Sequence, residues 1–369
     1  MAEQRKIRVA VVFGGRSAEH PISCVTAGSV MSAIDRDAYE VLPVGITREG
    51  SWVLASADPA RLAIEGETLP SVESTGAALV LPSDPRKRDL VVLEPGQMPR
   101  ELGGVDVVLP LLHGPYGEDG TIQGMLELAG VPYVGAGVLG SAASMDKAYM
   151  KLVFAGHGLP IGPYVVVRDR DWRRERKRVL DEVKELGWPV FVKPARSGSS
   201  IGIGKVQTED ELEAAVEAAR EHDPKVVVEA AIAGREIECG VLEGLDDAPP
   251  EASVPGEVLV REDHDFYDFE AKYLEGSDLA VPAELPAPLT AEVQRLAVAA
   301  FEAVSCEGLA RVDFFCTDDG RLLLNEINTM PGFTPASAFP RMWAASGLDY
   351  AALVDRLIQT ALRRPLGLR

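Results

Sequence analysis

Cysteine and long apolar runs are both scarce in this chain. The 369 residues include four cysteines and no C-x-x-C pair, at positions Cys24, Cys239, Cys306 and Cys316. Scattered cysteines are typical of reduced, buried thiols in a cytosolic protein and argue against a disulfide framework. No apolar run approaches the length of a membrane span, and the N-terminus enters a strand without the apolar core of a secretion signal. We therefore predict a cytoplasmic protein without membrane insertion.

Basic residues are also in the minority. Lys and Arg number 37 against 57 Asp and Glu, which gives a net charge of -20. This balance opposes binding to nucleic acid, because a polyanion would be repelled by most of the surface. An anionic small molecule would have to be met by locally placed Lys, Arg and backbone N–H groups.

Two common nucleotide-binding signatures are missing. The chain has no G-x-x-x-x-G-K-[ST] loop, and no G-x-G-x-x-G follows the first predicted strand. These absences argue against a P-loop NTPase and against a dinucleotide-dependent oxidoreductase. A segment rich in Gly and Ser does lie between two predicted strands at 192–206, with Lys193 on the first of them. Such a segment is most often a flexible turn, but it also lets backbone N–H groups approach phosphates closely.

Residues 311–328 carry the strongest chemical signal. Asp319-Gly320 lies between two apolar runs, and this dipeptide is favoured in two-residue type I′ turns. The pattern therefore predicts a hairpin in which Asp318 faces Arg321.

Counting back from that turn places Asp313 opposite Glu326, and Arg311 opposite Asn328. Side chains alternate between faces with period two, so all four share one face. Facing carboxylates destabilise a sheet, and a cation between them would remove the conflict. Two carboxylates and an amide oxygen suit Mg²⁺ or Mn²⁺, which often bridge substrate phosphates. The alternative, a surface hairpin with solvated charges, is disfavoured because both strands are otherwise apolar.

The remaining patterns predict an α/β chain, α+β overall, with three domains. In the first domain (1–135), a strand (7–13), a helix (22–34) and a strand (39–46) form a βαβ unit, which implies a parallel sheet. Residues 48–104 are predicted to be an irregular, strand-containing insertion. The second domain (136–232) contains the glycine-rich hairpin, and the third (233–369) contains the charged hairpin and a polar loop (262–277). Helices are expected at 119–129, 147–157, 172–186, 210–221, 291–304 and 350–363.

The order of these features resembles that of the ATP-grasp ligases. The matching positions are Lys147, Lys193 with its glycine-rich hairpin, Glu229, Asp313, Glu326 and Asn328. More narrowly, five blocks are similar to the D-alanine–D-alanine ligases: 14–23, 112–124, 144–147, 265–273 and 325–334. The resemblance implies a three-domain ATP-grasp fold, with an N-terminal parallel βαβ domain and two α+β domains that hold ATP between their sheets. It also implies ATP and D-alanine as substrates.

The resemblance assigns one group of residues to ATP. Lys147 and Lys193 would contact the phosphates as point charges, and Lys272 would reach the transferred phosphate. Glu229 and the backbone near it would receive the adenine, while Glu236 would hold the ribose. The full ATP set is Lys147, Lys193, Ser200, Glu229, Ala231, Ile232, Glu236 and Lys272. Two Mg²⁺ or Mn²⁺ ions would neutralise the charge of phosphoryl transfer, held by Asp313, Glu326 and Asn328.

A second group would bind and activate D-alanine. Glu19 would grip the ammonium group of the first D-alanine, although an acid at a helix N-terminus is also favoured by the helix dipole alone. Ser199 and Tyr273 would hydrogen-bond with Glu19 and close the polar loop. Arg311 and the N–H of Gly332 would stabilise an oxyanion. The remaining two are Ser337, for the carboxylate of the second D-alanine, and His113, near the substrates, where a lone histidine is more often structural.

The implied reaction has two steps. The carboxylate of the first D-alanine attacks the γ-phosphate of ATP to give an acyl phosphate, and the amine of the second then displaces phosphate. Tyr273 favours D-alanyl-D-alanine, for peptidoglycan synthesis, over the D-alanyl-D-lactate of depsipeptide ligases, in which this tyrosine is typically absent. Pro21 and Ala338 depart from the family pattern, and Ala338 leaves the selectivity of the second subsite open. A homodimer is expected from the resemblance alone.

Overall fold

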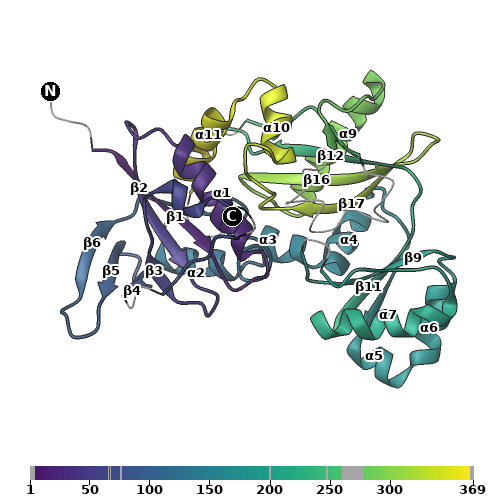
Figure 1. The fold of residues 1–369 in the computed structure, drawn as a ribbon. Coiled ribbons are helices and arrows are strands. Elements are labelled where there is room, and N and C mark those ends of the chain that lie inside the picture. The colour runs from purple at the N-terminus through teal and green to yellow at the C-terminus, as the bar shows by residue number, and fades with distance from the viewer. Residues whose placement is uncertain are drawn as a thin grey trace.

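The computed structural model describes residues 5–64, 66, 68–74, 77–198, 201–246, 248–259 and 278–365. Within these ranges the strands form four sheets, and helices cover or connect them (Figure 1). This mixed architecture confirms the predicted fold class. No helix in the described ranges is both long enough and apolar enough to cross a membrane. All four cysteines are buried and free, as predicted.

The first sheet begins with the predicted βαβ unit. Its strands, in spatial order, are β3 (Trp52–Leu54), β2 (Tyr39–Ile46), β1 (Ile7–Gly14) and β7 (Val107–Pro110). The helices that follow β1 and β7 are α1 (His20–Ala33) and α2 (Thr121–Ala129). β1 pairs in parallel with β2 and β7, and it is buried on both faces, which explains its unbroken apolar sequence. The strand predicted at 131–134 is reduced to a single bridge between Val108 and Tyr133.

The insertion at 48–104 is more regular than predicted. After the short 3-10 helix η1 (Pro59–Leu62), an antiparallel sheet is formed by β4 (Ala78–Val80), β5 (Asp89–Leu93) and β6 (Arg100–Gly104). Leu79, Leu90 and Val92 are buried against the first sheet. This small sheet lies at the far left of Figure 1, away from β16 and β17.

The central sheet carries the glycine-rich segment. Its strands, in spatial order, are β10 (Gly204–Val206), β9 (Val190–Pro194), β11 (Lys225–Ala230) and β8 (Tyr164–Arg168). The helices packed with it are α5 (Asp169–Arg174), α6 (Arg176–Lys184) and α7 (Glu209–His222). The single helix predicted at 172–186 is wrong, because Glu175 leaves helical conformation (φ −133°) and separates α5 from α6.

The large sheet is antiparallel and carries the charged hairpin. Its strands, in spatial order, are β15 (Asp278–Ala280), β14 (Gly256–Leu259), β12 (Arg235–Leu242), β16 (Leu309–Cys316) and β17 (Leu322–Asn328), and β13 (Glu251–Ala252) also pairs with β12. The remaining helices are α3 (Val138–Met145), α4 (Lys147–Gly156), α9 (Ala287–Ala303), α10 (Ala338–Ala345) and α11 (Tyr350–Arg363). Helices α3 and α10 and strand β8 were not predicted.

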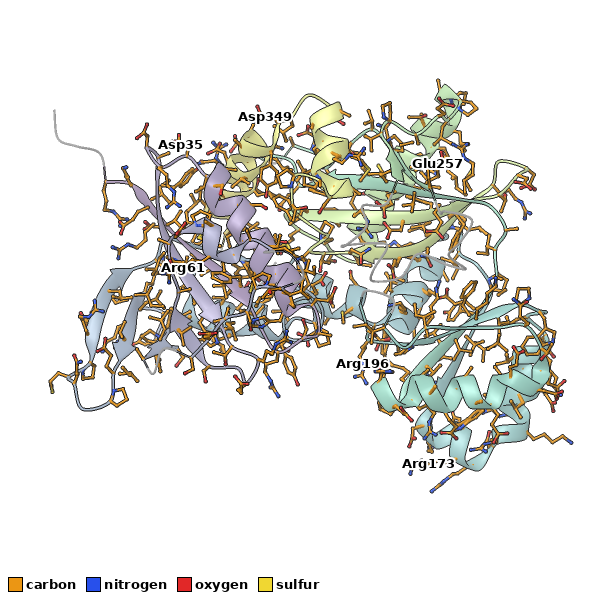
Figure 2. All side chains as sticks on the ribbon, in the orientation of Figure 1. Asp35, Arg61, Arg173, Arg196, Glu257 and Asp349 are labelled. Atoms are coloured by element: carbon orange, nitrogen blue, oxygen red, sulfur yellow. The ribbon has the colours of Figure 1, made fainter. Side chains whose placement is uncertain are left out.

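The two faces of the large sheet differ in character. One face is apolar and packs against α9 and α4, with Val312, Phe314 and Ile327 buried in it. The opposite face presents the charged residues of the hairpin to a cavity. Other charged residues, such as Arg173 and Asp349, lie on the outer surface (Figure 2). The charges inside the cavity therefore need an explanation of their own.

Candidate active site

A cavity of about 500 Å³ is lined by strands and loops of the three larger sheets. Thirteen of the predicted site residues line it: Glu19, His113, Lys147, Lys193, Glu229, Ile232, Glu236, Arg311, Asp313, Glu326, Asn328, Gly332 and Ser337. Ala231 is not among the lining residues, and its N–H donates to the carbonyl of Pro189 at 3.0 Å. Ser199, Ser200, Lys272 and Tyr273, with the loop 262–277, lie outside the described residues.

The predicted pairing in the charged hairpin is confirmed. Asp313 lies opposite Glu326, and Arg311 lies opposite Asn328. All four side chains face the cavity, as period-two alternation requires.

The predicted turn, however, is wrong. Thr317 N–H donates to the carbonyl of Arg321 at 2.9 Å, so three residues separate the strands instead of two, and Gly320 adopts a positive φ of 79°. A β-bulge between Asp313 and Phe314 then inserts Asn325 as an extra residue in β17 and restores the predicted pairing.

The facing carboxylates are balanced by an arginine on the same strand. Arg311 donates to both oxygens of Asp313, at 2.8 and 2.7 Å, and its Nε lies 3.2 Å from Glu238. Asn328 Nδ2 also donates to Asp313, at 3.0 Å. Burial opposes the charge on Arg311, but Asp313 and Glu238 raise the pKa of its guanidinium well above the ordinary value. The guanidinium is therefore a fixed positive charge in the cavity wall.

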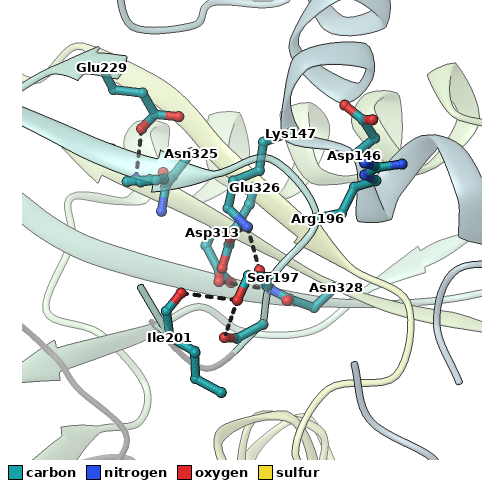
Figure 3. Close-up of polar contacts among 12 residues, drawn as sticks. Asp146, Lys147, Arg196, Ser197, Ile201, Glu229, Asp313, Asn325, Glu326 and Asn328 are labelled. Atoms are coloured by element: carbon teal, nitrogen blue, oxygen red, sulfur yellow. Dashed lines mark hydrogen bonds and ion pairs between the residues drawn. The ribbon is translucent and has the colours of Figure 1, made fainter. Parts of the chain in front are cut away.

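The glycine-rich loop is tied to the start of α4. Asp146 caps this helix by accepting N–H bonds from Ala148 and Tyr149, at 3.1 and 3.2 Å. Lys147 then projects into the cavity, where Nζ donates to the carbonyl of Ser197 at 2.8 Å and lies 3.7 Å from Glu326 (Figure 3). Lys147 thus bridges the glycine-rich loop and the charged hairpin.

A pair of lysines surrounds one buried carboxylate. Glu229 lies 2.7 Å from Lys193 Nζ and 3.0 Å from Lys151 Nζ. Burial would raise the pKa of Glu229, but the two lysines outweigh it and lower this pKa to about 2. Burial lowers the pKa of Lys151 against the opposing charge of Glu229, whereas for Lys193 burial is outweighed, chiefly by the charge of Glu229, and the pKa is raised. Lys193 is therefore the firmer positive charge of the cluster and the one that suits an anionic ligand.

Glu19 lies where three loops meet. It precedes α1, but its side chain makes no capping hydrogen bond to that helix. A Cβ on Gly114 would lie 2.5 Å from Glu19 Oε2, and one on Gly198 would lie 2.9 Å from the same atom. Only glycine therefore lets these loops from the first and central sheets approach the carboxylate closely. Placement at a shared loop junction fits ligand binding better than helix capping.

The segment that follows β17 forms the remaining wall. His113 Nδ1 contacts the carbonyl of Met330 at 3.1 Å. Thr334 N–H donates to Ser337 Oγ at 3.1 Å, which orients the serine at the start of α10. Gly332 and Ser337 both line the cavity. The predicted second-subsite residues and the hairpin thus lie on one continuous wall.

Three ionisable residues near the cavity were not predicted, although the sequence held a signal for each of them. Glu238 lies two residues after Glu236 on β12, so both face the cavity. Lys151 lies four residues after Lys147, one helical turn further along α4. Glu118 belongs to the 112–124 block that carries the family resemblance, and it lines the cavity.

Comparisons with known proteins agree with this geometry. Two family models match: D-ala D-ala ligase N-terminus over residues 8–136, and D-ala D-ala ligase C-terminus over residues 153–359. A D-alanine–D-alanine ligase from Streptomyces coelicolor is 61% identical over 370 residues, covering 98% of this chain and 95% of that protein.

Two solved structures extend the match to the fold. The VanG D-Ala:D-Ser ligase from Enterococcus faecalis has a TM-score of 0.83 at 34% identity, covering 97% of this chain and all of that chain. The D-alanine–D-alanine ligase from Coxiella burnetii has a TM-score of 0.78 at 33% identity, covering 98% of this chain and 94% of that chain. With both halves matched in sequence and the whole chain matched in structure, this protein belongs to the D-alanine–D-alanine ligase family.

Proposed function

We propose that this protein joins two D-alanines to form D-alanyl-D-alanine, converting ATP to ADP and phosphate. The observation that carries the proposal is the meeting, in one cavity, of the charged hairpin, the lysines Lys147 and Lys193, and Glu19. Such a set provides a metal-binding carboxylate pair, charges for phosphates and a carboxylate for an ammonium group. The names of the relatives give the substrate class, because they are D-alanine ligases.

ATP would lie between the central and large sheets. Lys147 and Lys193 would bind its phosphates beneath the glycine-rich loop, to which Ser200 belongs. Ile232 and the backbone near Ala231 would receive the adenine, and Glu236 the ribose. The side chain of Glu229 is ion-paired with Lys151 and Lys193. Its contribution to adenine binding would therefore be indirect, by holding this part of the cavity wall in place.

Magnesium or manganese ions would be held by Asp313, Glu326 and Asn328. The donor set fits, because both carboxylates face the cavity and turning the Asn328 amide would present its oxygen instead of its nitrogen. Within the described ranges no three His, Cys, Asp or Glu side chains are grouped as a metal site. Phosphate oxygens and water would therefore complete the coordination. The metal would supply neutralisation of phosphate charge.

The protein residues would act in sequence on the two amino acids. Glu19 would bind the ammonium group of the first D-alanine and so orient that substrate. A carboxylate oxygen of this D-alanine would then attack the γ-phosphorus of ATP, and ADP would leave. The amine of the second D-alanine, oriented through its carboxylate by Ser337, would then attack the acyl carbon. Arg311 and the Gly332 N–H would stabilise the resulting oxyanion. Loss of a proton from the amine and departure of phosphate would complete the amide.

The finer features of the family remain proposals for this chain. Ser199, Lys272 and Tyr273 would close the loop 262–277 over the cavity, which would exclude water from the acyl phosphate. The division into domains 1–135, 136–232 and 233–369, a homodimer and a cytoplasmic role in peptidoglycan synthesis are proposed on the same grounds. The second substrate is proposed to be D-alanine, because two relatives that are 61% and 60% identical are named D-alanine–D-alanine ligases.

The experiment that tests the proposal combines phosphate release with product mass. The purified protein is given ATP, Mg²⁺ and D-alanine, alone or with D-lactate or D-serine. D-alanyl-D-alanine as the main product in every mixture supports the proposal. An excess of D-alanyl-D-lactate or D-alanyl-D-serine would show that the second substrate is D-lactate or D-serine instead of D-alanine. Phosphate release that does not depend on D-alanine would overturn the proposed ligase function.

A further inference from the structure

Glu118 joins two loops that belong to different sheets. Its Oε2 accepts the N–H of Gly114 at 2.7 Å, within the loop that follows β7. Its Oε1 accepts the N–H of Met330 at 3.1 Å, in the loop that follows β17. His113, from the first of these loops, contacts the carbonyl of Met330 through Nδ1 at 3.1 Å. Met330 is thus held at both its N–H and its carbonyl by residues more than two hundred positions earlier.

This double contact also determines the tautomer of His113. A carbonyl can only accept, so Nδ1 carries the proton and the neutral ring keeps a lone pair on Nε2. Burial lowers the pKa of His113, which favours the neutral ring. Nε2 is buried and has no hydrogen-bond partner in the part of the chain that the structure describes. The hydrogen-bonding capacity of His113 toward protein is therefore directed at Met330.

The loop is anchored again three residues further on. The hydroxyl of Tyr350, on α11, donates to the carbonyl of Phe333 at 2.7 Å, and Phe333 is 2% exposed. Gly332 lies between these two anchors and lines the cavity. Its backbone orientation is therefore set by Met330 on one side and by Phe333 on the other.

The chemistry of the contact requires a carboxyl group at Glu118. Two N–H donors approach its two oxygens, whereas a glutamine would offer one oxygen and turn an NH₂ group toward the second donor. Burial, followed by the charge of Glu19, raises the pKa of Glu118 to about 8, and the N–H bonds from Gly114 and Met330, followed by the charge of Arg311, act in the opposite sense. A neutral carboxyl is a poor ligand for an ammonium group. The two carboxyl groups therefore have different roles: Glu118 binds backbone N–H groups, and Glu19 is proposed to bind the substrate ammonium group.

We propose that Glu118 is a positioning residue for the peptide-forming step: with His113 it holds Met330 so that the Gly332 N–H stays directed at the carbonyl under attack. This inference rests on the proposed function, in which Gly332 is an oxyanion donor. Loss of one such donor typically slows a reaction about 100- to 1000-fold, and a displaced donor costs less. Formation of the acyl phosphate creates no tetrahedral carbon, so that step depends less on Gly332.

The test separates the two steps in the variant Glu118→Gln. ATP carrying ¹⁸O at the β–γ bridge moves its label to non-bridging positions when ADP and acyl phosphate form reversibly. This exchange, measured with D-alanine present, reports the first step, while dipeptide formation reports the whole reaction. We expect kcat for the dipeptide to fall at least about tenfold, with isotope exchange and the KM for D-alanine within threefold of the unmodified protein.

Asp119→Asn is the matched control. Asp119 is also a carboxylate that accepts two backbone N–H bonds, from Tyr116 at 2.9 Å and Thr121 at 3.0 Å, but both donors are close to it in the sequence, in its own loop and at the start of α2. Its removal should leave the ratio of exchange to dipeptide formation unchanged. If Glu118→Gln does not fold, Glu118→Asp replaces it, because it keeps both oxygens and shortens their reach.

Two results would overturn the inference. One is a dipeptide kcat within twofold of the unmodified protein in the folded variant. The other is an equal loss of exchange and of dipeptide formation, which would indicate general damage to the site. A lack of D-alanine-dependent exchange in the unmodified protein would instead overturn the proposed function on which the inference rests.

Discussion

Replacing Lys151 by methionine is expected to weaken both the fold and ATP binding. Lys151 and Lys193 share the carboxylate of Glu229, and all three residues are less than 10% exposed. Against the effect of burial, the two lysines lower the pKa of Glu229 from 4.5 to about 2. At about 1.4 kcal/mol per pKa unit, the ionised carboxylate is favoured by roughly 3 kcal/mol in the folded protein.

Lys151→Met keeps the unbranched side chain up to the position of Cε and removes the charged ammonium group. Because Lys193 remains, the expected loss of unfolding free energy is about 1–2 kcal/mol, less than the roughly 3–5 kcal/mol lost when a buried charge has no partner. A lowered carboxyl pKa stabilises the fold above pH 4.5, and this stabilisation disappears as the pH falls toward 2. The variant should therefore lose less stability than the unmodified protein across that window.

The effect on ATP follows from two roles of Lys193: its observed ion pair with Glu229 and its proposed contact with an ATP phosphate. To reach a phosphate, Lys193 must move away from Glu229, and Lys151 then neutralises the carboxylate. Without Lys151 that movement uncovers a buried charge, so the affinity for a non-hydrolysable ATP analogue should fall about five- to tenfold, equivalent to about 1–1.4 kcal/mol. Isothermal calorimetry measures this affinity, and denaturant unfolding measures the stability.

Two further variants make the result decisive. In a Glu229→Gln background, Lys151→Met should reduce the unfolding free energy and the ATP affinity by less than in the unmodified protein, because the carboxylate charge to be neutralised is gone. The half-buried Lys184, paired with the exposed Glu209, is the control, and Lys184→Met should change stability by no more than about 0.5 kcal/mol. The reasoning would be refuted if Lys151→Met reduced the unfolding free energy equally in the unmodified protein and in the Glu229→Gln background, or if it left the ATP affinity unchanged.

Three other predictions concern metal binding, product choice and pH. Glu326→Gln should abolish dipeptide formation without unfolding the protein, whereas Glu292→Gln, on the half-buried surface of α9, should leave activity intact. Full activity of Glu326→Gln in Mg²⁺ would contradict the metal assignment. Tyr273→Phe should raise the use of D-lactate relative to D-alanine, measured by product mass, and an unchanged ratio would place selectivity elsewhere. The raised pKa of Glu118, about 8 against an ordinary 4.5, means that the folded state binds a proton that the unfolded state has lost. The melting temperature should therefore fall as the pH rises from 5 to 8. An equally steep fall in Glu118→Gln would show that Glu118 is not the group responsible.

Local sequence signals were sufficient for much of the fold. The unbroken apolar strand at 7–13 and the helix after it gave the parallel βαβ unit correctly, because burial on both faces leaves a clear pattern. The hairpin pairing was correct through two errors that cancel, a turn one residue too short and an unrecognised bulge. The bulge had a signal in β17, where the buried Leu322, Leu324 and Ile327 are spaced by two and then three residues. Strict alternation would have placed Ile327 on the cavity face.

The site was less accessible to local reasoning. The meeting of Glu19 with Gly114 and Gly198 joins three loops that are distant in the sequence, and only tertiary packing brings them together. The family resemblance supplied that information, whereas spacing and charge could not. Glu238 and Lys151 could have been found, because each follows a predicted site residue at the period of its own strand or helix. The link from Glu118 to Met330 spans two sheets and has no counterpart in local pattern.

The most direct test of the central claim follows the carboxylate oxygen of D-alanine. The protein is incubated with ATP, Mg²⁺ and D-alanine labelled with ¹⁸O in its carboxyl group. The ¹⁸O content of the released phosphate and of the dipeptide is then measured by mass spectrometry. The account predicts one ¹⁸O in each phosphate, because the attacking carboxylate oxygen leaves with the phosphoryl group. Unlabelled phosphate accompanying the dipeptide would contradict the acyl-phosphate route, and an absence of dipeptide would contradict the ligase assignment itself.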